Sequence, residues 1–85
     1  MVRNSKKQPR VKYRKLGRHR AWGLYHWTNE LIELDPRMKP KLALDTLIHE
    51  SLHHLFPDLP ESTIEKKATQ LTAILWREDY RRVAQ

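Results

Sequence analysis

Residues 47–54 read LIHESLHH and contain the pattern His-Glu-x-x-His. On a helix, residues four apart project from one face, so His49 and His53 can direct ring nitrogens at the same metal ion. This spacing is typical of zinc sites, in which each imidazole nitrogen lies about 2.0–2.1 Å from the ion. Glu50 is turned away from that ion, which favours a role as the base that takes a proton from a water molecule at the zinc.

The residues around the motif have the periodicity of a helix. Apolar side chains recur there at intervals of three and four positions, namely Leu44, Leu47, Ile48, Leu52 and Leu55. His49 and His53 fall on the strip beside this stripe, at the edge of the expected core, where a pair of metal ligands would lie. The alternative is that both are ordinary helix histidines that form hydrogen bonds at a half-buried face.

Size and composition limit what the chain can be. With 85 residues and three tryptophans it can form one small domain, to which a bound metal would add folding free energy. The chain has no cysteine, so metal ligands must be His, Asp or Glu. No apolar run is long enough to span a bilayer or to form a signal peptide, so we expect a cytoplasmic protein without a membrane partner, as a monomer or small homo-oligomer.

The basic charge is concentrated at the N-terminus. Residues 1–20 hold nine of the 17 Lys and Arg residues and no acidic ones, whereas the remainder holds eight basic residues against ten acidic ones. We therefore divide the chain into a basic arm, residues 1–17, and a domain, residues 18–85. Within residues 3–20, the candidates for binding nucleic acid are Lys6, Lys7, Arg10, Lys12, Arg14 and Lys15. The alternative is a solvated basic tail.

The order of the expected elements predicts an α+β domain. Residues 18–34 have the aromatic-rich strands and central turn of a hairpin, and residues 11–16 partly alternate as a possible first strand. A motif helix over residues 40–55 and a second helix over residues 61–82 follow. We expect a β-hairpin or three-stranded antiparallel sheet packed on two helices, the first of which carries the motif.

A catalytic zinc usually has three protein ligands and an open position. Residues 57–60 reverse the chain and bring the start of the second helix beside the motif helix, so Glu65 and Glu61 are the leading candidates. We favour Glu65, because it flanks the apolar stripe of the second helix. Acidic residues in a first helical turn are also common simply because they stabilise the helix dipole. Further candidates are His26, His54 and Asp58.

Other polar residues near the motif are candidates for supporting roles. Asp45 precedes His49 by four residues and can accept its second ring N–H, and Asp58 can do the same for His53. Asp45 can equally be a solvated residue near the helix start. His54 points away from the metal strip, which favours a surface histidine. Residues that can stabilise a developing oxyanion are Tyr25, His26 and Tyr80.

Residues 44–59, the segment 65–68 and the strand 30–36 together resemble a known family. The resemblance is to small His-Glu-x-x-His zinc metallopeptidase-like proteins of phages and bacteria, which are relatives of the ImmA/IrrE type of gluzincin. SprT-like proteases are more distant, because they use a third histidine beyond the motif and none follows His54. The resemblance implies a minimal zincin-like domain, with zinc on His49, His53 and Glu65 and with Glu50 as general base. It also implies that a peptide adds as an extra strand along residues 27–34.

Two functions follow as hypotheses. The first is a Zn²⁺-dependent metallopeptidase that hydrolyses a peptide or protein substrate with Glu50 as the base. The second is a nucleic-acid-associated module that uses the basic arm, with a structural or catalytically inactive zinc site.

Overall fold

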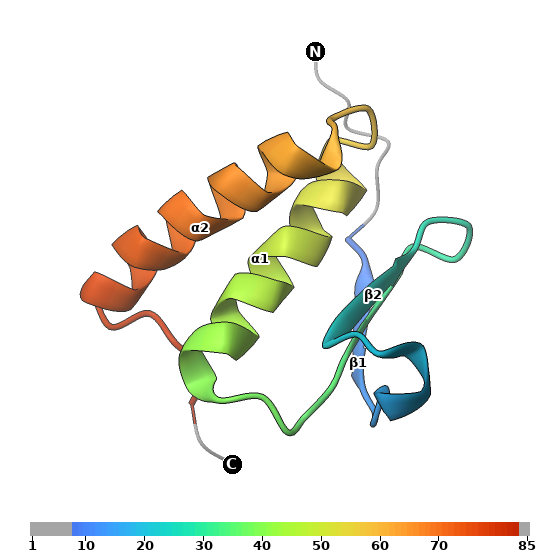
Figure 1. The fold of residues 1–85 in the computed structure, drawn as a ribbon, viewed down its shortest axis with the longest axis horizontal. Coiled ribbons are helices and arrows are strands. Elements are labelled where there is room, and N and C mark those ends of the chain that lie inside the picture. Colours follow the sequence, from blue (N-terminus) through green and yellow to red (C-terminus); the bar gives the residue numbers. More distant parts are fainter. Residues whose placement is uncertain (1–7, 84–85) are drawn as a thin grey trace.

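The fold is a three-layer arrangement in which the motif helix lies between the sheet and the second helix (Figure 1). The computed structural model describes residues 8–83. Its elements are β1 (Arg10–Tyr13), a 3-10 turn (Gly17–His19), β2 (Gly23–His26), β3 (Leu31–Leu34), α1 (Pro40–Leu55) and α2 (Glu61–Arg77). The predicted α+β class is confirmed. No helix among the described residues is long and apolar enough to cross a membrane.

The sheet is mixed, with the strand order β1-β3-β2. β2 and β3 form the predicted antiparallel hairpin, with Tyr25 opposite Ile32. β1 pairs with the other side of β3 in parallel, with Val11 beside Ile32, so the prediction of an all-antiparallel sheet is wrong. A parallel neighbour becomes possible because the chain crosses from β1 through the 3-10 turn and β2 before it returns as β3.

The boundary predicted after residue 17 is also wrong, because part of the basic arm belongs to the domain. β1 is a strand of the sheet, and Leu16 has no exposed surface. The backbone N–H of Leu16 donates a hydrogen bond to Asp35 Oδ2 at 2.9 Å. The strand expected at residues 11–16 is present, but it spans Arg10–Tyr13. The predicted nucleic-acid residues Lys6 and Lys7 lie outside the described residues.

The motif helix has the predicted bounds, and α2 ends earlier than predicted. Pro40 is in the first turn of α1, where its missing N–H removes no hydrogen bond. α2 stops at Arg77 because Asp79 adopts the left-handed conformation, with φ of 66°. The N–H of Tyr80 then bonds the carbonyl of Leu75 and the N–H of Asp79 bonds that of Trp76, which is a Schellman motif that closes the helix.

The core fills both interfaces of α1. Between the helices, Leu52 packs with Ile64 and Ala68 of α2. On the other side, Ile32 and Leu34 of the central strand are buried. Two faces of α1 are therefore packed in the core, and among the described elements α2 contacts α1 but not the sheet. This position leaves the flank of α1 that carries the histidines open at the edge of the core.

A carboxylate on the central strand predicts how stability depends on pH. Glu33 is 7% exposed. It accepts hydrogen bonds from Arg14 and from His26 Nε2, the latter at 2.8 Å. The Arg14 guanidinium, assisted by His26, lowers the pKa of Glu33 from 4.5 to about 2. This lower pKa in the folded state means that the contacts stabilise the fold fully above about pH 4.5 and that this contribution is lost as the pH falls towards 2.

Glu33→Gln is therefore expected to lower the urea midpoint of unfolding at neutral pH, and the difference from wild type should shrink as the pH falls from 4.5 to 2. Urea titrations of both proteins across this range measure the difference directly. A difference that stays constant with pH would contradict the assigned role of Glu33.

Candidate metal centre

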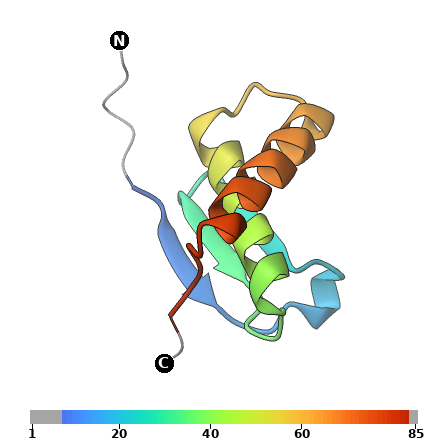
Figure 2. The same ribbon diagram turned by 90° about the vertical axis from the view of Figure 1, so that its left-hand side faces the viewer.

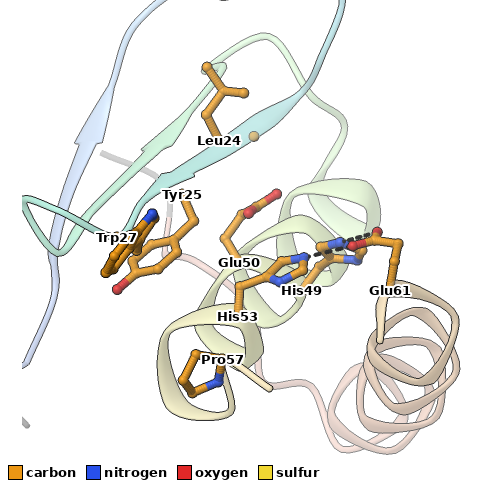
Figure 3. Close-up of a pocket in the computed structure, with 9 residues that line it drawn as sticks. Leu24, Tyr25, Trp27, His49, Glu50, His53, Pro57 and Glu61 are labelled. Atoms are coloured by element: carbon orange, nitrogen blue, oxygen red, sulfur yellow. Dashed lines mark ion pairs between the residues drawn. The ribbon is translucent and has the colours of Figure 1, made fainter. Parts of the chain in front are cut away.

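Three side chains meet on the flank of α1 (Figure 3). His49 and His53 lie one turn apart, with ring centroids separated by 5.0 Å. Each Nε2 is 2.8 Å from one oxygen of Glu61, His49 from Oε2 and His53 from Oε1. One ligand atom from each residue lies within 4.8 Å of the other two, and all three side chains reach solvent. Two imidazoles and one carboxylate therefore converge on a space that an ion can enter.

The acidic member of this cluster is Glu61, so the preference for Glu65 is corrected. The turn after α1 brings the first residue of α2 beside the end of α1. At 100° per residue, Glu61 lies about 40° from the middle of the buried stripe of Ile64 and Ala68, whereas Glu65 lies about 80° away. Glu65 consequently projects into solvent from the next turn. The structure thus brings Glu61, rather than Glu65, to the histidine pair.

Glu50 occupies the position expected of a base. It is half-buried, and Figure 3 shows its side chain between β2 and the histidine pair. Burial raises the pKa of Glu50, and the nearby His49 and His53 charges oppose this shift. A carboxylate with a raised pKa holds a proton more readily than one in water, which suits a group that must accept a proton and then release it.

A pocket of about 610 Å³ opens in front of the cluster. Its lining includes Leu24 and Tyr25 of β2 together with Trp27 and Pro57. Gly23 allows β2 to lie close to α1, because a Cβ there would come within 2.5 Å of Thr46 Cγ2 and 3.2 Å of Glu50 Cγ. The pocket thus places an edge strand, an apolar wall and a carboxylate around the three converging side chains.

The central position of β3 corrects the expectation that a peptide adds along residues 27–34. β3 is already paired on both sides, with β1 and with β2. Among the described strands, β2 is the edge strand that lines the pocket, so any added strand would pair with residues 23–26.

The supporting residues differ in part from the predictions. Asp45 accepts a hydrogen bond from Thr72 Oγ1 at 3.1 Å, so it links α1 to α2 rather than being directed at His49. Asp58 is exposed in the turn between the helices. His54 is 1% exposed, which contradicts the prediction of a surface histidine. Its Nδ1 lies 2.7 Å from the hydroxyl of Tyr25, because this side of α1 faces the sheet.

The remaining candidates lie away from the cluster or in other contacts. His26 pairs with Glu33 on the sheet, and Tyr80 is exposed after α2. Tyr25 lines the pocket, and burial, assisted by the charge of Glu30, raises the pKa of its hydroxyl. Of the three residues proposed to stabilise an oxyanion, Tyr25 is the one beside the pocket.

Comparisons with protein-family models, curated proteins and solved structures found no significant match to this chain.

Proposed function

We propose that this protein is a zinc-dependent peptidase, with zinc held by His49, His53 and Glu61 and with Glu50 as general base. The observation that carries the proposal is the convergence of two imidazole nitrogens and a carboxylate oxygen within 4.8 Å, with the motif glutamate alongside. The resemblance to ImmA/IrrE-type gluzincins points to the same class.

The donor set fits zinc. Two neutral imidazoles and one carboxylate form a common ligand set of catalytic zinc, which keeps a further position open. The Nε2 atoms of His49 and His53 both face Glu61, so these three side chains can supply the ligands from the positions that they already occupy. The chain has no cysteine to form a competing thiolate site.

The chemistry divides between the metal and Glu50. Zinc bound at such a triad lowers the pKa of water and polarises a carbonyl oxygen. The Glu50 carboxylate takes a proton from water as the water oxygen attacks the carbonyl carbon of the peptide. Glu50 then passes this proton to the amide nitrogen as the carbon–nitrogen bond breaks, which yields a carboxylic acid and an amine.

An extended peptide is the form of substrate that suits the pocket. β2 is an edge strand with backbone groups available for pairing, and it borders the space in front of Glu50. A peptide paired with residues 23–26 would run along the pocket and expose one of its bonds to the base.

The test is to incubate the zinc-loaded protein with a pool of unstructured peptides and to identify new termini by mass spectrometry. We expect cleavage that stops when zinc is removed by a chelator and returns when zinc is restored. Cleavage that survives removal of the metal would contradict the mechanism. Stoichiometric zinc without cleavage of any peptide would favour a structural metal instead.

A further inference from the structure

The edge of the sheet farthest from the pocket carries a row of cations. All four residues of β1 are exposed, and the strand lies at the edge of the sheet order β1-β3-β2. Figure 2 shows β1 along the outer side of the molecule, with the C-terminal segment passing beside it. Arg10 and Lys12 belong to this strand, and Lys15 follows it as a further exposed cation.

The sheet register places Arg10 and Lys12 on the face that points away from the helices. Tyr25, opposite Ile32, contacts His54 of α1, so this register position faces the helices. Val11 is the β1 partner of Ile32 and shares that face. Because successive strand residues alternate, Arg10 and Lys12 project to the opposite face, about 6.6 Å apart along the strand. No helix of the described chain contacts β1.

Two of the carboxylates near this row are already paired. Glu33 lies beside Lys12 in the sheet, but it is covered by Arg14 and His26. Asp35 is 1% exposed and is held by Arg37 and by the backbone of Leu16. Arg10 and Lys12 are therefore not neutralised by either of these groups, whereas Arg14 is engaged with Glu33.

The C-terminal segment adds a cation on the other side of β1. The guanidinium carbon of Arg82 lies 4.0 Å from the centre of the Tyr13 ring. This contact covers an aromatic face that would otherwise be available for stacking on a base. This edge thus carries positive charge from both ends of the chain and offers few groups that could recognise individual bases.

We propose that the outer face of β1, through Arg10 and Lys12, binds the phosphate backbone of a nucleic acid independently of sequence, with Lys15 and Arg82 adding positive charge near the same edge. A linear row of cations along one strand matches a linear polyanion. An anionic membrane is less well matched, because Val11, the apolar residue between Arg10 and Lys12, faces the helices. The site lies at the opposite edge of the sheet from β2, so bound nucleic acid would leave the pocket open.

The test measures how binding depends on salt. Fluorescence anisotropy of the full chain with labelled random-sequence duplex DNA, single-stranded DNA and RNA is recorded between about 50 and 200 mM salt. Arg10→Gln with Lys12→Gln should weaken binding at every salt concentration. It should also reduce the slope of log affinity against log salt by about 1.8 for a duplex or about 1.4 for a single strand. The oligonucleotide that binds most tightly identifies the class of nucleic acid.

The matched control is Lys66→Gln with Lys67→Gln, which removes the same charge from exposed positions on α2 and should leave the slope unchanged. Lys12→Arg, which keeps the charge, should retain wild-type binding. If the double variant of β1 fails to fold by circular dichroism, the single variants are used, each with about half the slope change. Equal losses in both double variants, no binding to any oligonucleotide, or binding only to anionic vesicles would overturn the proposal.

Discussion

Glu61→Ala is expected to lose most of its bound zinc, whereas Glu65→Ala should keep about as much as the wild-type protein. Glu61 supplies the carboxylate that meets both imidazoles, and Glu65 projects into solvent one turn later. Losing a hydrogen-bond partner of a ligand already weakens metal affinity about 10–100-fold, so losing a ligand should cost more than this. Metal analysis of the purified proteins and titration against a zinc chelator measure the effect.

This pair of variants is well matched, because both remove one carboxylate from the first turns of the same helix. Circular dichroism establishes that each variant folds. His53→Ala should behave like Glu61→Ala, because it removes another member of the cluster. Zinc lost from the Glu65 variant and retained in the Glu61 variant would show that Glu65, not Glu61, is the third ligand.

Glu50→Gln is expected to reduce peptide cleavage by about 10²- to 10⁴-fold, the usual contribution of a general base. Glutamine has nearly the same shape and cannot accept the proton, so zinc content should stay at the wild-type level. The turnover number and the zinc content, measured on the same preparation, separate loss of the base from loss of the metal. Cleavage at the wild-type rate would exclude Glu50 as the base.

The stability of Glu50→Gln to urea provides a control for the activity measurement. Burial raises the pKa of Glu50, which means that folding disfavours its charged form. Glutamine removes that charge, so the variant should be at least as stable to urea as the wild-type protein at neutral pH. A marked loss of stability would indicate that Glu50 holds the fold together, and the activity result would then need a second variant such as Glu50→Asp.

Local sequence patterns predicted the elements that depend on local chemistry. The turn between two apolar segments predicted the β2-β3 hairpin, and a proline at the start together with Phe56-Pro57 at the end predicted the bounds of α1. The spacing of His49 and His53 placed both imidazoles on one face, which the structure confirms. Zinc binding and catalysis remain predictions.

The features that the sequence did not predict depend on contacts between distant segments. The parallel pairing of β1 joins residues about twenty positions apart, and no local pattern specifies it. The choice of Glu61 over Glu65 depends on how α2 rotates against α1. His54 was misassigned because a helix with one obvious apolar stripe was expected to have one buried side, whereas α1 is covered on two.

The cations on β1 also affect how the chain meets copies of itself. An exposed edge strand offers unpaired backbone groups that can join the edge of another molecule, and charged side chains along it are a recognised defence against such aggregation. With Arg10 and Lys12 on β1, two such edges would repel each other, whereas β2 has Gly23 and Leu24 at its start. The charge distribution thus makes the two edges of one small sheet unequal, so that self-association is disfavoured at β1 while β2 stays open to an extended chain.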